Sequence, residues 1–148
     1  MNRYTAIFLI LMSGAVLTGQ DTITVMHYNL LNYGNTTTYC TQSNNNINDK
    51  AAAMSIVCTY IGPDIITVNE FGANSFAPGH FLNNVLNVHG VNYYQAATFT
   101  NVSSSDLVNF LFYDSRKFVL HSQHAIATNI RDINIYRLYH NDPNLSLH

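Results

Sequence analysis

The sequence predicts an α/β fold, because a strand, a helix and a second strand follow one another near its beginning. Residues 23–30 (ITVMHYNL) are rich in β-forming side chains, and residues 65–70 (IITVNE) are mostly β-branched. Between them, a helix is expected to begin near Asn48 and Asp49 and to end at Gly62. A strand–helix–strand unit of this kind joins two parallel strands of one sheet.

The second half of the chain is expected to extend this sheet with antiparallel strands. The sheet would then be mixed, and the fold would be α+β. A second helix is expected over residues 79–88, and further strands at residues 93–100, 107–114, 118–125 and 133–140. The connections between these strands are short, as in a meander. One apolar face of the first helix is expected to contact the core, and it comprises Ala53, Val57, Tyr60 and Ile61.

The composition excludes several classes of protein. The chain has 148 residues, with 6 basic and 8 acidic ones, so its formal net charge is −2. Charged residues make up 9% of the chain, against roughly 25% in an ordinary soluble domain. Hydrophobic residues make up 47%, which excludes wholesale disorder. The low charge excludes a basic nucleic-acid-binding arm, and the 2 cysteines exclude a disulfide-dense scaffold.

Residues 1–20 have the pattern of a secretory signal peptide. Arg3 supplies the positive charge, and an apolar run over residues 6–12 is followed by small residues. The run is too short for a stable membrane anchor, and a buried N-terminal helix is the alternative. We therefore expect a secreted or periplasmic mature domain over residues 21–148, in which Cys40 and Cys58 either form a disulfide or remain thiols.

Polar side chains stand at the carboxyl ends of the first two expected strands. Asn29 shares a strand face with Ile23, Val25 and His27, while Glu70 shares a face with Ile66 and Val68. Open α/β sheets bind their ligands beyond the carboxyl ends of the strands, so Asn29 and Glu70 are expected to meet at one site. A carboxylate there suits Mg²⁺. The alternative is an exposed Glu70 and an Asn29 that caps a turn.

Two segments, MHYNLLNYGN (26–35) and IGPDIITVNEFG (61–72), resemble the endonuclease/exonuclease/phosphatase superfamily, which has the deoxyribonuclease-I-like fold. Members of that family begin with a strand ending in a Y-N-L-x-N-like motif. A P-D-I-I-x-x-x-E motif follows, usually with Gln before the Glu, and Asn69 takes the place of that Gln here. Residues 107–120 and 131–139 look like later strands of the same family.

The resemblance implies a four-layer α/β/β/α sandwich and a secreted metal-dependent phosphoesterase that hydrolyses phosphodiesters in a nuclease-like way. Glu70 would carry Mg²⁺ (or Mn²⁺), Asn29 would orient the metal shell or the phosphate, and Arg131 would contact the phosphate. The alternative for Arg131 is a surface charge paired with Asp132. The substrate would be a nucleic acid, or a lipid or small phosphodiester. The scarcity of basic residues argues against tight non-specific DNA binding. Tyr33 and Phe71, beside the two motifs, are candidates for lining a substrate cleft.

Later motifs of the family, a histidine-bearing strand, G-D-x-N and a final Asp-His pair, are not found after Arg131. His140 ends an expected strand and His148 is the last residue of the sequence, so no following element positions either of them as the family's histidine. We therefore expect the chain to be the N-terminal half of a longer hydrolase and to be inactive alone. A non-catalytic secreted β-rich binding module with the same fold is the alternative. The phosphoester and the general base or acid are left open.

Overall fold

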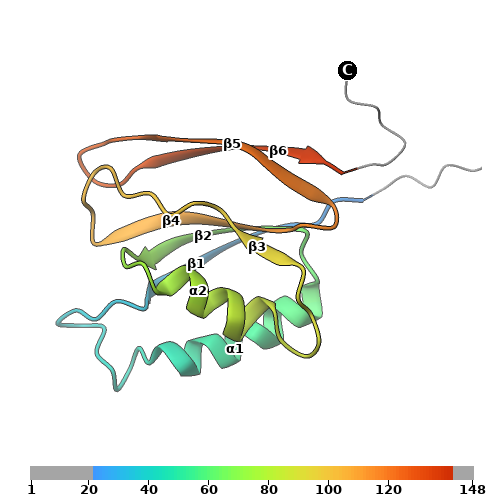
Figure 1. The fold of residues 1–148 in the computed structure, drawn as a ribbon. Coiled ribbons are helices and arrows are strands. Elements are labelled where there is room, and N and C mark those ends of the chain that lie inside the picture. Colours follow the sequence, from blue (N-terminus) through green and yellow to red (C-terminus); the bar gives the residue numbers. More distant parts are fainter. Residues whose placement is uncertain (1–21, 142–148) are drawn as a thin grey trace, which may run out of the picture.

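The computed structural model describes residues 22–141. The elements are β1 (Val25–Tyr33), α1 (Ile47–Ile61), β2 (Ile65–Gly72), α2 (Ala77–Phe81), the π-helical turn η1 (Leu82–Leu86), β3 (Tyr94–Ala96), β4 (Leu107–Asp114), β5 (Phe118–Ile126) and β6 (Ile133–His140). The helices cover one side of the sheet that contains β1, β2, β3 and β4, and the β5–β6 hairpin lies over the other side (Figure 1). The fold is mixed α+β. The predicted signal peptide lies outside the described residues.

The four-stranded sheet has the order β1-β2-β4-β3. Its first pair, β1 and β2, is parallel, which confirms the predicted strand–helix–strand unit. The antiparallel pairs β2–β4 and β3–β4 confirm that the sheet is mixed. None of the helices within residues 22–141 has the length and apolarity that a membrane crossing requires.

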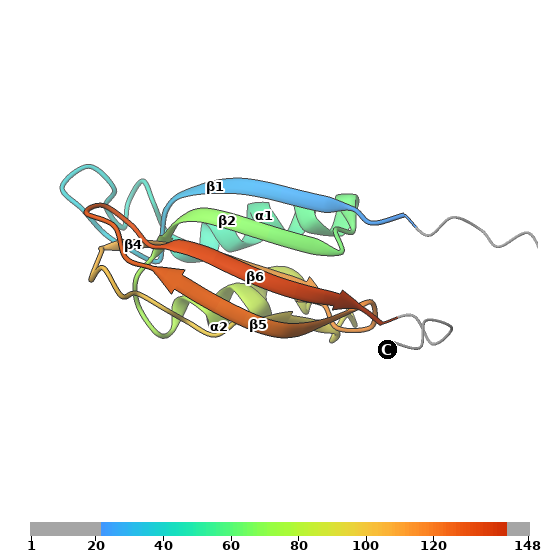
Figure 2. The ribbon, with the colours of Figure 1, turned by 90° about the horizontal axis from the view of Figure 1, so that it is seen from above.

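The predicted single meander is wrong, because β5 and β6 form a separate two-stranded sheet. Both edges of β4 are already paired, one with β2 and the other with β3. The strand that follows β4 therefore has no free edge beside it and crosses to the second layer, where β5 pairs only with β6. Viewed from above, β5 and β6 run side by side, while β1 lies uncovered at the far side of the sheet (Figure 2).

Helix α1 is capped at both ends by residues suited to that role. The Asn46 side chain accepts hydrogen bonds from the backbone N–H groups of Asn48 and Asp49, as an N-cap does. At the other end, Gly62 has φ 58°, and its N–H donates to the carbonyl of Cys58. The second helical stretch begins at Ala77, near the predicted start, and it continues from α2 directly into η1.

The predicted core face of α1 is wrong except at Val57, which is half-buried and packs against the core. Its buried residues are Ala51, Met54 and Cys58, whereas Tyr60 is 91% exposed and Ala53 is also exposed. Apolar residues surround most of this helix, so periodicity alone does not distinguish the buried stripe from its neighbours. The position of the sheet decides which stripe is covered.

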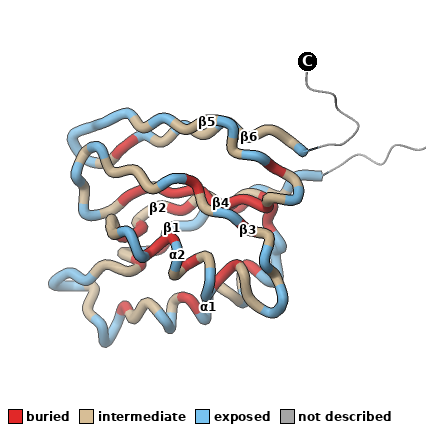
Figure 3. Tube along the Cα trace, viewed as in Figure 1, coloured by how far each residue is buried: buried red, intermediate tan, exposed pale blue. Residues whose placement is uncertain are grey.

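An aromatic cluster fills the space between the four-stranded sheet and α2. It consists of Tyr33, Phe71, Phe81, Phe110 and Phe112, each 2% exposed or less. Tyr33 and Phe71 stack with their ring centroids 5.4 Å apart, and the Tyr33 hydroxyl lies 2.9 Å from Nδ1 of His80. Buried residues follow the strands and the inner faces of the helices (Figure 3). The expectation that Tyr33 and Phe71 line a substrate cleft is therefore wrong, since both rings belong to the core.

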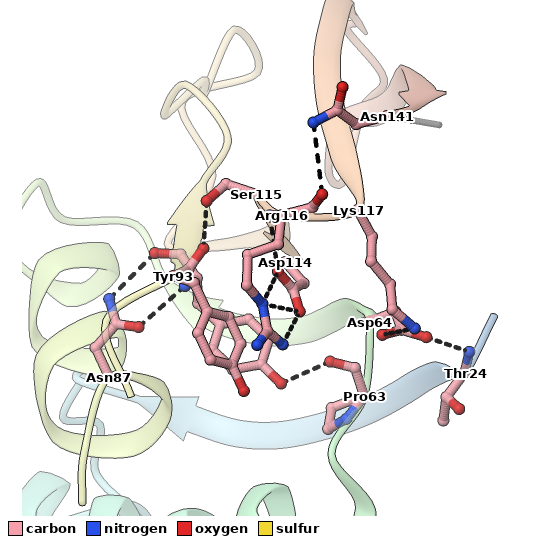
Figure 4. A network of polar contacts seen from close by, with 11 residues as sticks. Thr24, Pro63, Asp64, Asn87, Tyr93, Asp114, Ser115, Arg116, Lys117 and Asn141 are labelled. Atoms are coloured by element: carbon pink, nitrogen blue, oxygen red, sulfur yellow. Dashed lines mark hydrogen bonds and ion pairs between the residues drawn. The ribbon is translucent and has the colours of Figure 1, made fainter. Parts of the chain in front are cut away.

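A polar network closes the end of the sheet where β2 begins and β4 ends (Figure 4). Asp114, 2% exposed, accepts hydrogen bonds from the Arg116 guanidinium, whose carbon lies 3.3 Å from the centroid of the Tyr93 ring. Asp64 pairs with Lys117 at 2.9 Å and accepts from the backbone N–H of Thr24. The network joins the beginnings of β1, β2 and β5 to the end of β4.

This network predicts acid sensitivity. Burial raises the pKa of Asp114, but hydrogen bonds from Arg116 and its charge outweigh burial and lower that pKa below its usual value. A carboxyl with a lower pKa in the folded state stabilises the fold above its unfolded pKa, about 4, and this contribution is lost as the pH falls further. We expect Asp114→Asn to lose about 1–3 kcal/mol of unfolding free energy at neutral pH and less of it at low pH. Urea denaturation of the wild type and the variant at several pH values measures the loss of unfolding free energy. An equal loss at every pH would contradict this account.

Candidate functional site

Glu70 lies near the carboxyl end of β2 and has a left-handed backbone conformation, with φ 53°. The pairing of β2 with β4 shifts register between Val68 and Phe71, as at a β-bulge. Ile66, Val68 and Phe71 all belong to the core, with the extra residue of the bulge between the last two. The prediction that Glu70 shares the face of Ile66 and Val68 is therefore wrong, because the bulge gives that place to Phe71.

The left-handed conformation of Glu70 is costly. A non-glycine residue loses roughly 1–2 kcal/mol in this region, because its Cβ approaches the following carbonyl oxygen. Such strain persists where the surrounding structure imposes it, and it concentrates at functional sites. The bulge leaves the Glu70 side chain 24% exposed at the end of the strand. Glu70 therefore has the backbone strain and the accessibility of a binding residue.

Asn29 lies on the strand next to that of Glu70, as predicted from the parallel pairing. The register of β1 and β2 pairs Asn29 with Asn69, the residue immediately before Glu70. The Oδ1 atom of Asn29 accepts a hydrogen bond of 2.9 Å from the backbone N–H of Leu31, so this side chain also caps the turn that follows. The two strand ends come together, and the amide of Asn29 is held by its own turn.

The face of β1 that carries Asn29 points away from the helices. Val25, His27 and Asn29 are exposed, whereas Met26 and Leu30 belong to the core. Asn29 therefore shares a face with Val25 and His27 as predicted, but that face is not buried. Nδ1 of His27 lies 2.8 Å from the Thr67 hydroxyl on β2, so this histidine is hydrogen-bonded across the exposed face of the two strands.

Arg131 meets Glu70 across the two layers. Its Nη2 atom lies 3.9 Å from Oε1 of Glu70, and the two side chains are 31% and 24% exposed. Asp132 instead accepts hydrogen bonds from the backbone N–H groups of Val102 and Ser103 and from the Ser103 hydroxyl. The alternative that pairs Arg131 with Asp132 is thus wrong. A long and half-exposed ion pair is worth at most about 1 kcal/mol, so Arg131 can exchange Glu70 for another anion at little cost.

Lys50 is a residue of this site that sequence reasoning missed. Its Nζ donates hydrogen bonds to the backbone carbonyls of Leu30, at 2.8 Å, and Leu31. Burial lowers the pKa of Lys50, while the negative charge of Glu70 acts in the opposite direction. One feature of the sequence could have indicated this role, namely a lysine near the beginning of the expected helix. The helix dipole disfavours a positive charge there unless another contact compensates.

Asn69 belongs to the motif noted in the sequence, but it was not predicted to be a residue of the site. Its Oδ1 is buried and has no hydrogen-bond partner among the described residues. A buried acceptor without a partner costs roughly 1–3 kcal/mol, so its persistence next to Glu70 needs an explanation. A ligand or water that donates to this oxygen would remove that cost.

The carboxylates available for a metal are few. Within residues 22–141 there is no group of three or more His, Cys, Asp or Glu side chains that could enclose a metal ion. Mg²⁺ is nevertheless often held by one or two carboxylates, with water and substrate phosphate oxygens completing its shell. Glu70, a single partly exposed carboxylate, fits this open kind of site and does not fit a closed structural one.

Both cysteines are free thiols, which decides the question that the sequence left open. Cys40 accepts a hydrogen bond from the Asn32 side chain, while Cys58 is buried on the core side of α1. Burial raises the pKa of Cys58 to about 11, which keeps it protonated and unreactive.

No protein-family model matches this chain, and no curated protein or solved structure does. Its function is therefore inferred from the residues that meet at the end of β2.

Proposed function

We propose that this chain supplies the metal- and phosphate-binding residues of a divalent-metal-dependent phosphoesterase. The observation that carries the proposal is the carboxylate of Glu70, a residue with strained left-handed backbone, which lies 3.9 Å from the guanidinium of Arg131; the preceding residue, Asn69, pairs with Asn29 on β1. A carboxylate for a cation, a guanidinium for a phosphate and an amide that can hydrogen-bond to either are groups that suit a phosphodiester site.

Each residue has a distinct role in this proposal. Glu70 holds Mg²⁺ or Mn²⁺, and Arg131 leaves the weak ion pair to bind a phosphoryl oxygen. The amide of Asn29 orients the phosphate or a water of the metal shell. When bound, the cation neutralises phosphoryl oxygens and lowers the pKa of a coordinated water.

The same proposal includes the setting of the domain. We place the four-stranded sheet and its helices in an α/β/β/α sandwich of the endonuclease/exonuclease/phosphatase kind, with the β5–β6 hairpin in the second sheet. The stacking of β5–β6 on the side of the sheet opposite the helices supports this arrangement. Secretion is part of the proposal and rests on the signal-like pattern of residues 1–20. With 6 basic residues in the chain, a lipid or small phosphodiester suits it better than long DNA.

The experiment is hydrolysis of bis-p-nitrophenyl phosphate by the protein at the full length that its gene encodes. We expect p-nitrophenol release that requires Mg²⁺ or Mn²⁺ and stops when EDTA removes the metal. Hydrolysis that is unchanged by EDTA would contradict the proposal. Absence of both hydrolysis and metal binding would favour the alternative function, a secreted binding module without catalytic activity.

A further inference from the structure

The turn that follows Asn29 contains two consecutive strained residues. Leu31 has φ 43° and Asn32 has φ 60°, so both are left-handed without being glycine. The register of β1 with β2 is interrupted here, between Asn29 and Tyr33. The left-handed conformation is costly for Leu31 and less so for Asn32, since asparagine adopts it more readily, so this turn needs contacts that hold it in place.

Three side chains supply those contacts. Lys50, from α1, donates to the carbonyls of Leu30 and Leu31. Asn45, 5% exposed in the loop before α1, donates to the carbonyl of Asn32 at 3.0 Å. Asn29 accepts from the N–H of Leu31. Lys50 is the one of these three that carries a charge.

We propose that Lys50 is a positioning residue of the phosphoester site: by binding the two carbonyls it fixes the turn that orients the amide of Asn29. This inference rests on the proposed function, because Asn29 is taken to act on the phosphate or the metal shell. Lys50 itself contacts backbone rather than substrate, and it acts through Asn29.

Lysine suits this position for a physical reason. An ammonium group donates up to three hydrogen bonds, so it can bind two carbonyl oxygens and still keep one donor. Its charge interacts with that of Glu70, which partly opposes the effect of burial on the pKa of Lys50. A methionine has similar length but no donor and no charge, whereas an arginine keeps both.

The sign of an effect on metal binding tests the inference. Removing a positive charge close to Glu70 should, by Coulomb's law alone, strengthen the binding of a cation. If Lys50 positions the site, the same substitution should weaken it. We expect Lys50→Met to reduce Mn²⁺ affinity about 10-fold, the size usual for residues that support metal ligands. Lys50→Arg should restore it to within about 2-fold, because both donors and charge are kept.

The full chain is titrated with Mn²⁺, and binding is detected as paramagnetic broadening of the backbone amide NMR signals. Lys117→Met is the matched control, because it removes the same charge at the opposite end of β2, where Lys117 pairs with Asp64. It should leave Mn²⁺ affinity unchanged. Affinity in Lys50→Met that is equal to or higher than in the wild type would overturn the inference.

A second measurement, amide hydrogen exchange, separates the failure of this inference from the failure of the proposed function. If the wild-type chain shows no broadening around Glu70, the proposed function fails. Amide hydrogen exchange at Leu31, whose N–H binds Asn29, then decides the role of Lys50 in holding the turn. Exchange that is faster in Lys50→Met and normal in Lys50→Arg supports it, and unchanged exchange in Lys50→Met overturns it.

Discussion

In the protein at the full length that its gene encodes, Glu70→Gln is expected to reduce Mg²⁺-dependent phosphodiester hydrolysis by at least about 100-fold, which corresponds to about 2.7 kcal/mol of lost transition-state stabilisation. Glutamine keeps the size and hydrogen-bonding reach of the side chain but lacks the negative charge that holds the cation. The loss should therefore appear without unfolding. The comparison uses initial rates with bis-p-nitrophenyl phosphate at saturating Mg²⁺, together with thermal melting of both proteins.

Glu70→Gly separates the functional role of this residue from its structural cost. Glycine adopts φ 53° without the Cβ clash, so this variant should be as stable as the wild type or up to ~1 kcal/mol more stable. Its activity should be lost. His89→Gly is the matched control, because His89 is exposed and also has φ 53°, but lies away from β2. It should keep full activity.

Either of two results would count against this account of Glu70. Retention of activity in Glu70→Gln would remove the carboxylate from the chemistry. A large loss of stability in Glu70→Gly, with none in His89→Gly, would mean that the side chain is needed for folding rather than strained for function.

Phe71→Ala is expected to cost about 3–5 kcal/mol of unfolding free energy, the largest stability effect that we predict. The Phe71 ring is fully buried and stacks between Tyr33, at 5.4 Å, and Phe110, at 5.6 Å. Its removal leaves a cavity in the centre of the aromatic cluster. A domain with a total stability of about 5–15 kcal/mol would be close to unfolding after such a loss.

Phe76→Ala is the control for this prediction. Phe76 is 54% exposed and contacts the edge of His80, so its truncation should cost less than about 1 kcal/mol. Urea denaturation followed by far-UV circular dichroism measures both variants. Similar losses in the two variants would show that the aromatic cluster is not the centre of the core.

The order of strands and helices was predictable from the sequence because local signals define it. The strands at Leu107–Asp114 and Ile133–His140 have the predicted bounds, since each is a run of β-forming residues between turns. The parallel pairing of β1 and β2 follows from the helix between them. By contrast, the separation of β5 from β4 depends on which sheet edges are free, and this is decided by the pairing of distant segments.

The candidate site was predictable in part. That Asn29 and Glu70 come together follows from the parallel pairing of their strands. The orientation of Glu70 was not predictable, because alternation along a strand assumes extended backbone and Glu70 is left-handed. The contact of Arg131 with Glu70 crosses two layers of the fold, so no spacing in the sequence indicates it.

The central claim is that the carboxylate of Glu70 binds a divalent cation, and paramagnetic broadening by Mn²⁺ tests it most directly. In the wild-type chain, the account predicts broadening of amide signals concentrated around Glu70 and around Asn29 on the neighbouring strand, reversed by excess Mg²⁺. In Glu70→Gln the same titration should leave those signals sharp. Equal broadening in the two proteins, or broadening concentrated elsewhere in the chain, would contradict the account.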